Sequence, residues 1–363
     1  MRANDTSFVD ADAAMASIAR GSGQLADASV AGLDFSGRDL SKVLFRNVDL
    51  TQAWLAGTNL AGAVFMHCRL PGALLSGAEL GATQWQSCDL QGAVLRDTRG
   101  ERISMSECVL READAAGARW THAMLDRCDL SSASFVDATW LQCDAHACRF
   151  DACDFSRAVL QRFTAMDAEL STARFDASDL TQAYLAGARL IGQRLGNCVL
   201  TMAQFNRADL AGADFAEAQL TQAQFQQADL QGAVFSRATG RYVRFGGARM
   251  AGALLDGATF ESSDFAGADL TAARMTALQA SQSVFAEARC QGAQFARALL
   301  VDGDFSHADL SDADCSHADF SGANLHRIVE RNTRWTDAVR RGTYSTDAER
   351  ARAEDWRAAP VTS

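Results

Sequence analysis

Large apolar side chains recur at every fifth residue between Phe35 and Leu325. Of the 59 positions spaced five residues apart in this range, 45 are Leu or Phe. The residue two places before each such centre is small, usually Ala, and we call it the small position. The residue directly before the centre is mostly polar, and we call it the outward position. Because side chains alternate between the two faces of a strand, each unit predicts one short strand followed by a two-residue corner.

A second period, of 20 residues, sets the number of strands in each turn of the chain. Cysteine fills the small position at five places 20 residues apart: Cys68, Cys88, Cys108, Cys128 and Cys148. Phenylalanine fills the centre at the same spacing from Phe205 to Phe305. Four five-residue units therefore make one turn of square cross-section. We expect an all-β solenoid of about fifteen turns, which grows by stacking rather than around several separate cores.

The five-residue pattern resembles that of the pentapeptide-repeat family. Units such as Ala208-Asp209-Leu210-Ala211-Gly212 carry the resemblance, and the register does not slip over about four-fifths of the chain. The resemblance implies a right-handed quadrilateral β-helix. It also implies that the centre and the small position point into the core.

Irregular centres indicate that the core is packed by volume. Gly100 and Gly240 have no side chain at the centre, and Trp120 and Phe260, one turn later, are large enough to fill part of the space. Tryptophan and alanine centres gather between residues 85 and 165. We expect the turns in this region to be the least regular.

The repeat is flanked by segments of different composition. Residues 1–24 predict a helical cap, with Ser7 at the start of the helix and an end near Gly21. The repeat solenoid is expected over residues 25–340. The first segment either covers the open end of the first turn or binds a partner.

Residues 341–363 predict a C-terminal helix and tail. Thr346-Asp347-Ala348-Glu349 forms a capping box, from which the helix would reach Ala358 before Pro360 stops it. Two roles stay open for this helix. It either covers the last turn or mediates a homodimer through a terminal cap.

Charge and hydropathy narrow the functional classes. The net charge of −11 argues against direct nucleic-acid binding, which requires basic patches. No apolar run approaches the ~20 residues of a membrane helix, and the N-terminus lacks a basic region followed by an apolar core. We therefore expect a soluble protein of the bacterial cytoplasm that binds no membrane. Export through a type VI secretion system stays open.

Reactive residue types are present, but not in patterns typical of catalysis. The ten cysteines lack a C-x-x-C pair, and we interpret them as buried structural thiols rather than as a zinc site. The six histidines are scattered, and most of them are expected on outer corners without metal-ligand partners. No nucleophile elbow, phosphate loop or H-E-x-x-H motif occurs. The sequence predicts no catalytic, cofactor-binding or metal-binding residue, and hence no enzyme.

Two groups of surface residues are candidates for binding a protein. Apolar side chains occupy outward positions near the N-terminal end, and such exposed ladders often mark an interface. They are Trp54, Leu74 and Val94 on one side of the turn, and Leu44 and Val64 on another. The alternative is that the N-terminal segment folds over one of these columns. The second group is an acidic surface near the C-terminal end: Asp302, Asp304, Asp309, Asp312, Asp314 and Asp319. This surface either receives a basic partner or repels the edge-to-edge stacking of solenoids.

These features favour a non-catalytic protein–protein interaction scaffold built on a rigid rod. The tail from Arg331 to Trp335, and from Thr346 to Trp356, resembles tails of pentapeptide proteins in bacterial type VI secretion clusters. The resemblance implies an accessory, adaptor or effector-loading role with a secretion-system component as partner. The alternative is a DNA mimic that binds DNA gyrase, as pentapeptide proteins of quinolone resistance do. The longest acidic column is interrupted by arginine, which weakens that alternative.

Overall fold

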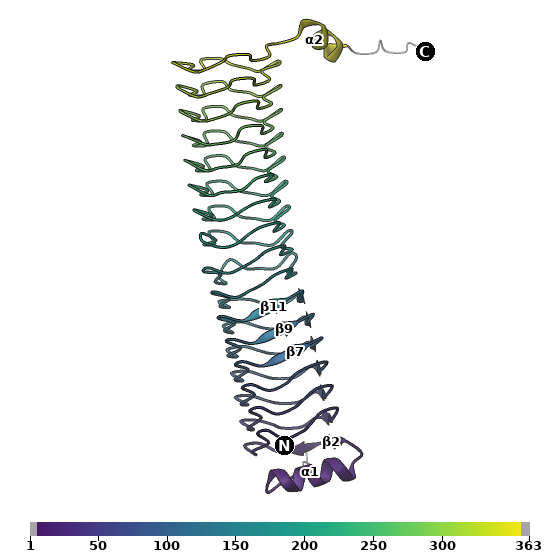
Figure 1. Cartoon of the computed structure of the whole chain (residues 1–363). Helices are drawn as coiled ribbons and strands as arrows, with labels where there is room; N and C mark the ends of the chain where they lie inside the picture. The colour runs from purple at the N-terminus through teal and green to yellow at the C-terminus, as the bar shows by residue number, and fades with distance from the viewer. Residues whose placement is uncertain (1–5, 357–363) are drawn as a thin grey trace, which may run out of the picture. The chain divides into compact units, whose positions relative to one another are not determined.

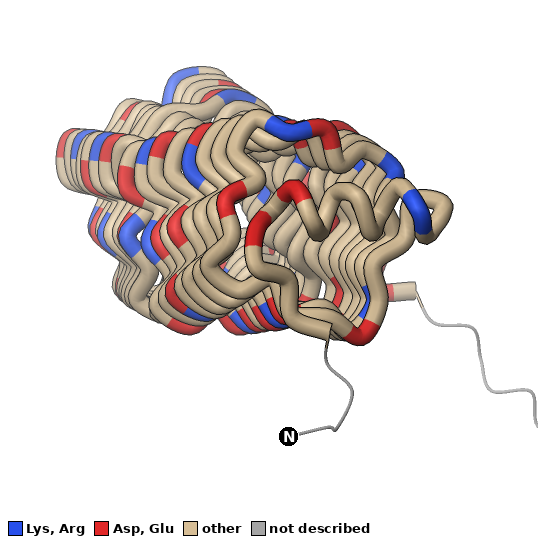
Figure 2. The backbone as a smooth tube through the Cα atoms, turned by 90° about the horizontal axis from the view of Figure 1, so that it is seen from below, with Lys and Arg blue, Asp and Glu red and all other residues tan. Residues whose placement is uncertain are grey.

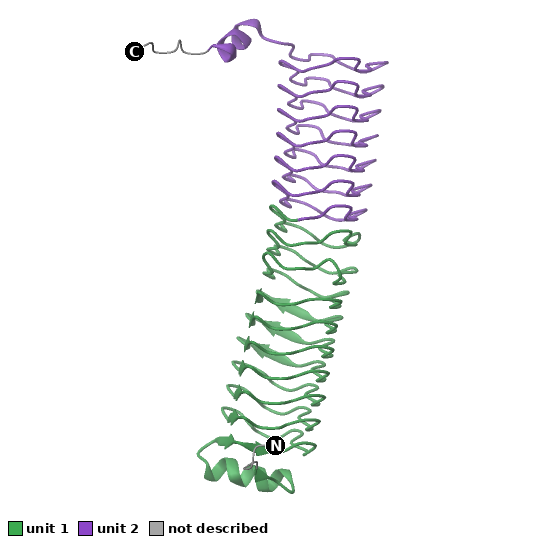
Figure 3. Cartoon of the chain, turned by 180° about the vertical axis from the view of Figure 1, so that it is seen from behind, with its two compact units in different colours: residues 1–208 green, residues 209–363 purple. Residues whose placement is uncertain are grey.

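The chain forms a parallel-strand β-solenoid with a short helix near each end (Figure 1). The computed structural model describes residues 6–356. It divides into two compact units, residues 1–208 and 209–363, which are described separately (Figure 3).

Strands of two or three residues lie in the first unit. The seven-stranded sheet has the order β12-β10-β8-β6-β5-β4-β2, the three-stranded sheet the order β11-β9-β7, and β1 pairs with β3. The bounds are β1 Thr6–Ser7, α1 Ala11–Arg20, β2 Gln24–Ala26, β3 Ala28–Ser29, β4 Leu44–Arg46, β5 Val64–Met66, β6 Gln84–Gln86, β7 Arg99–Glu101, β8 Ser104–Ser106, β9 Arg119–Thr121, β10 Met124–Asp126, β11 Thr139–Leu141 and β12 Asp144–His146. Helix α2, Ala348–Asp355, belongs to the second unit.

The solenoid register is 20 residues throughout each unit. Phe45 lies beside Phe65, and Phe65 beside Trp85, in parallel strands. Isolated parallel bridges of the same spacing continue this ladder, and the last one joins Asn324 to Tyr344. The prediction of four sides per turn is therefore confirmed. We name the sides by one outward residue each: A by Trp54, B by Asn59, C by Val64 and D by Arg69.

Side chains at the centres and small positions form the core. Phe245, Phe265, Phe285 and Phe305 are fully buried and stack at ring-centroid distances of 4.8, 4.7 and 4.6 Å in succession. Strand spacing brings identical side chains of successive turns face to face, so the ladder of rings follows directly from the 20-residue period.

The gaps at the glycine centres are filled from the next side of the same turn. A Cβ on Gly100 would lie 2.6 Å from Ile103 Cδ1, and a Cβ on Gly240 would lie 2.9 Å from Val243 Cγ2. Branched residues at the small position thus take up the volume that glycine leaves. We had expected Trp120 and Phe260 to fill these gaps, but the nearest side chains are those of Ile103 and Val243.

The turns between residues 85 and 165 hold the 20-residue register in sheets β7–β9–β11 and β6–β8–β10–β12. Within the described chain, no bridge joins Arg149 to Glu169, and again none joins Arg174 to Arg194. There the Gln193 Nε2 donates to the Ala173 carbonyl oxygen at 2.7 Å, in place of the backbone N–H of the regular ladder. The expectation of irregular turns between residues 85 and 165 thus holds only at Arg149, near the end of that range, and the second interruption lies beyond it.

Helix α1 begins at a different cap from the one predicted. The Asp10 side chain accepts a hydrogen bond from the Ala13 N–H at 2.8 Å, whereas Ser7 lies in β1 beside Ser29. The helix buries Ala11, Ala14 and Ile18 and contacts β2. It is thus an amphipathic helix packed at the first strands of the solenoid (Figure 1).

Helix α2 is polar on every face and buries no residue. Its N-cap is Asp347, whose carboxylate accepts from the N–H groups of Glu349 and Arg350, rather than Thr346. The helix ends at Asp355, and the predicted end at Ala358 lies outside the described residues. Helix α2 therefore does not bury the core of the last turn. Neither helix within residues 6–356 is long and apolar enough to cross a membrane.

The final turn covers the core with its own side chains. Trp335 packs edge-on against Phe320 and donates its Nε1–H to Glu330 at 3.0 Å. The Arg340 guanidinium lies over the Trp335 ring, 4.4 Å from its centroid. Glu330, Trp335 and Arg340 all occupy centre positions. The last turn therefore covers the end of the apolar core with three side chains that contact one another through polar and cation–π contacts.

Candidate protein-binding surface

Carboxylates at outward positions support the corners that follow them. The Asp269 Oδ1 accepts from the Thr271 N–H at 3.1 Å and from its hydroxyl at 2.6 Å. In Asp34, hydrogen bonds from the Ser36 hydroxyl and N–H hold the pKa below its usual range. Such a bond stabilises a turn by satisfying a backbone donor that has left the ladder. Many acidic side chains of this surface are therefore part of the fold.

The candidate acidic residues share this role and do not form one face. Asp304, Asp309, Asp314 and Asp319 accept N–H hydrogen bonds from the serine two residues later. They lie five residues apart, on sides C, D, A and B in turn. Asp302 and Asp312 lie at corners, and the Asp312 carboxylate accepts from the Asn332 amide. The six carboxylates thus surround the turns instead of lining one stripe.

Arginines from neighbouring turns pair with many of the outward acids. On side D, Arg249 lies 3.0 Å from Asp229 and Arg289 lies 3.8 Å from Asp269. In the acidic region, Arg334 reaches Asp314 at 3.2 Å. Figure 2 shows acidic and basic positions alternating along the outside of the turns. Much of the acidic charge is therefore paired locally.

The apolar candidates fall on two opposite sides of the first unit. Parallel bridges join Trp54 to Leu74 and Leu74 to Val94 on side A, while Leu44 and Val64 pair on side C. Sides A and C are opposite sides of the four-sided turn, so the five residues form two separate surfaces. The sequence pattern identified both columns. Because they face in opposite directions, one flat interface can include only one of them.

Trp54 is the most exposed of these residues. Its exposed fraction is 53%, whereas the other four are half-buried. The corners around it are small and uncharged, with Ala56-Gly57 after it and Pro71-Gly72 before Leu74. Residues 6–24 leave the indole open, since α1 contacts β2 on side C. Side A thus presents a short apolar column of Trp54, Leu74 and Val94, with the carboxylate of Asp34 on the other side of Trp54.

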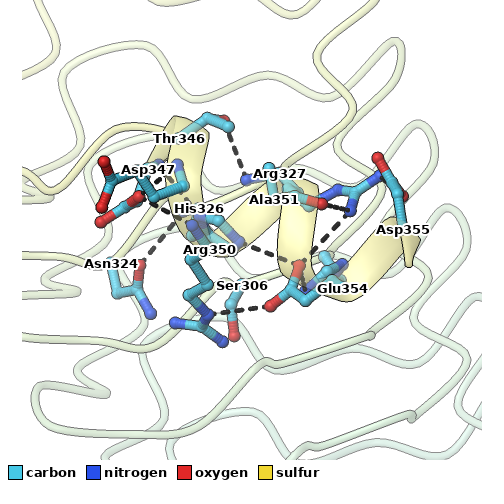
Figure 4. Close-up of polar contacts among 12 residues, drawn as sticks. Ser306, Asn324, His326, Arg327, Thr346, Asp347, Arg350, Ala351, Glu354 and Asp355 are labelled. Carbon is cyan, nitrogen blue, oxygen red and sulfur yellow. Dashed lines mark hydrogen bonds and ion pairs between the residues drawn. The ribbon is translucent and has the colours of Figure 1, made fainter.

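A polar cluster attaches α2 to the last turns (Figure 4). Glu354 Oε2 lies 3.1 Å from His326 Nε2 and 3.3 Å from His307 Nε2. His326 lies at a corner, as predicted, but it is only 2% exposed, and the expectation that the histidines lack a carboxylate partner was wrong for His307 and His326. Arg327 binds Asp355 at 2.8 Å. The sequence signal was the 19-residue separation of the two histidines, which places them on corresponding corners of successive turns.

The cluster has the residue types of a metal site but a different hydrogen-bond pattern. The ligand atoms of His307, His326 and Glu354 lie within 4.8 Å of one another. A histidine that binds a metal through one nitrogen normally donates from the other. Here His326 Nδ1 accepts from the Asp347 N–H at 3.1 Å, so Nε2 carries the proton and donates to Glu354. The geometry favours a hydrogen-bonded clasp over a metal centre.

Glu354 is the centre of this clasp. The hydrogen bond from His326, together with that from Arg350, lowers the pKa of its carboxyl to about 2. The Arg350 Nε donates to its second oxygen at 2.8 Å. Since α2 buries no residue, these polar contacts are what hold it beside the solenoid.

Comparison with known proteins agrees with the fold. The family model for pentapeptide repeats matches in eight copies over residues 44–81, 103–139, 183–222, 218–257, 241–277 and 288–327, more than half of the chain. The chain belongs to the pentapeptide-repeat family. No curated protein matches its sequence significantly.

Two solved pentapeptide-repeat structures illustrate the similarity. HetL, involved in heterocyst differentiation regulation in the cyanobacterium Nostoc, is 19% identical, with a TM-score of 0.21 over 93% of this chain and 97% of HetL. Full-length QnrB1, a plasmid-mediated fluoroquinolone resistance protein, is 15% identical, with a TM-score of 0.17 over 70% of this chain and 96% of QnrB1. Both likenesses concern the fold alone.

All ten cysteines of this pentapeptide-repeat chain are buried and unpaired. The thiols of the 20-residue column point to backbone carbonyls, as Cys68 does to Phe45 at 3.4 Å. Burial raises the pKa of Cys143 to about 12. Because all ten are buried, these side chains behave as small core residues.

Proposed function

We propose that this pentapeptide-repeat protein is a non-catalytic protein–protein interaction scaffold. The observation that carries the proposal is the exposed Trp54 at the head of the apolar column with Leu74 and Val94. Buried tryptophans surrounded by flat apolar surface dominate the energetics of many interfaces. A contiguous apolar column on a protein surface is also typical of a docking site.

Side A offers shape and apolar contact rather than main-chain hydrogen bonds. The Trp54 N–H donates to Leu33 O, and its carbonyl accepts from the Phe35 N–H. Both groups are therefore used within the ladder. A partner would bury the indole against its own apolar surface, and the absence of charge at the neighbouring corners lowers the desolvation cost.

We favour a bacterial type VI secretion component as the partner, with the chain as adaptor, accessory or effector-loading protein. The support is the resemblance of two stretches of the tail, from Arg331 to Trp335 and from Thr346 to Trp356. The alternative is the DNA-mimicking binding of DNA gyrase. Acids spread over four sides, and paired with arginine, weigh against an imitation of duplex phosphate.

Affinity capture from the native host tests the proposal. The tagged wild-type chain is compared with Trp54→Ala and with the matched control Tyr242→Ala, which removes an aromatic ring that is 50% exposed elsewhere. We expect the Trp54 variant to lose the specifically captured protein and the control to retain it. Equal capture by all three would contradict the proposal. Recovery of DNA gyrase, with inhibition of its supercoiling by the wild type, would support the alternative.

A further inference from the structure

Five cysteines of the first unit lie one above another on side D. They occupy the same small position of successive turns, and all five are buried and unpaired: Cys68, Cys88, Cys108, Cys128 and Cys148. Parallel bridges join the outward residues beside them, from Arg69 to Arg149, at the 20-residue spacing. The backbones of neighbouring cysteines are therefore one strand spacing apart, about 4.8 Å.

The five side chains also share one orientation. Each Sγ lies between 3.4 and 3.6 Å from the carbonyl oxygen of the residue two places earlier. The Sγ of Cys148 also reaches back to the preceding turn and accepts from the Cys128 N–H at 3.4 Å. One orientation repeated at strand spacing places the five sulfur atoms in single file, and we call them the thiol column.

The spacing of the thiol column fits a two-coordinate metal ion. A tetrahedral zinc site requires four ligands around one point, whereas each interval of the column offers two sulfurs. Two metal–thiolate bonds of about 2.3 Å in line span about 4.6 Å, close to the strand spacing of about 4.8 Å. Thiolates select soft ions such as copper(I).

The thiol column is accessible at its last member. Within the described residues, the Cys148 carbonyl lacks the hydrogen bond from the next strand that the other four cysteine carbonyls accept, and no bridge joins Arg149 to Glu169. Cys148 is 8% exposed, whereas the other four cysteines are each 1% exposed. This interruption of the ladder gives an ion a point of entry at Cys148.

We propose that the thiol column binds copper(I), with one ion between each pair of neighbouring sulfurs. Without metal the thiols pack as small core residues. Five thiols in single file leave four intervals. Full loading replaces the five S–H protons, which pass to the buffer, by four Cu⁺ ions. This site is independent of Trp54 and of the function proposed for side A.

The charge of the loaded column predicts cooperative loading. Four Cu⁺ ions and five thiolates carry one net negative charge, and a single Cu⁺ between two thiolates carries the same charge. Burial of charge in an apolar core is costly, but each ion after the first adds none. We expect the empty and the fully loaded chain to be the main species during a titration.

Serine variants test the column by position. Serine is compatible with the small position, because Ser283 donates to the Phe260 carbonyl there at 2.8 Å. Cys108→Ser divides the column into two pairs of thiols, and Cys68→Ser removes only its first member. The control is Cys143→Ser, a buried thiol outside the column.

The reduced full chain is titrated anaerobically with copper(I) in competition with bicinchoninate, and native mass spectrometry counts the bound ions. We expect four ions in the wild type and in C143S, three in C68S and two in C108S. The count is repeated on chains refolded from urea with copper(I), so that slow entry does not conceal the site. Absence of bound copper in both experiments, or an equal loss of ions in C108S and C143S, would overturn the proposal.

Discussion

Aspartate at the outward position stabilises the corner that follows it. Asp269 satisfies the Thr271 N–H and hydroxyl in addition to facing Arg289 across one strand spacing. This local bond explains why acidic residues alternate with arginines along side D without forming a binding site. The charge of the surface thus follows largely from the demands of the corners.

Replacement of Asp269 tests this account of the corner. D269A leaves the Thr271 N–H without its acceptor, and we expect a loss of about 1 kcal/mol in the free energy of unfolding. D269N keeps an oxygen at the same position and should lose less. Urea unfolding followed by circular dichroism measures both variants. A D269N protein as unstable as D269A would show that the charge, rather than the corner hydrogen bond, is what matters.

Helix α2 depends on the ionised form of Glu354. Its pKa of about 2 in the folded chain lies below the usual 4.5 of a glutamate. A lowered pKa stabilises the docked helix above about pH 4.5, and this stabilisation is lost as the pH falls from about 4.5 towards 2. A nitroxide on R352C reports the docking, since the native cysteines are buried.

We expect the nitroxide to be immobile at pH 7 and to become mobile through that acidic range. With E354Q added, which removes the charge at every pH, the label should already be mobile at pH 7. A label that is equally immobile in both proteins would contradict the polar clasp.

Zinc provides a separate test of the same cluster. Because His326 Nδ1 accepts from the Asp347 N–H, the nitrogen facing Glu354 is protonated and has no lone pair for a metal. We expect no stoichiometric zinc after equilibration and desalting, with His326→Ala as the reference. One zinc per wild-type chain that the variant lacks would show that the cluster rearranges into a metal site.

The elements could be predicted from sequence to the extent that they are periodic. The 20-residue spacing of Cys68, Cys88 and Cys108 predicts the turn, since identical positions stack in the ladder. Helix caps were less certain, because Asp10 and Asp347 compete with nearby Ser7 and Thr346 for the same role. Gln193 could not be anticipated, because its insertion depends on a carbonyl 20 residues away. The 19-residue separation of His307 and His326 was present in the sequence, but their partner Glu354 was missed because it lies 28 residues after His326, on a helix.

Across the whole molecule, paired charges and one apolar column favour protein binding. The column was visible in the sequence, and the structure adds that Trp54 is exposed and that Leu44 and Val64 face the opposite side. The acidic candidates were also visible, but their five-residue spacing already distributes them over four sides. A partner of side A therefore has to recognise an indole that lies between Asp34 and the apolar Leu74.

The most direct test is calorimetric titration of the captured partner with the wild type, Trp54→Ala and Tyr242→Ala. Loss of an interface tryptophan costs about 2 kcal/mol or more, which is roughly a thirtyfold change in affinity. We predict that Trp54→Ala weakens binding by at least this factor and that Tyr242→Ala binds as the wild type does. A Trp54→Ala dissociation constant within twofold of the wild-type value would contradict the assignment of side A as the binding surface.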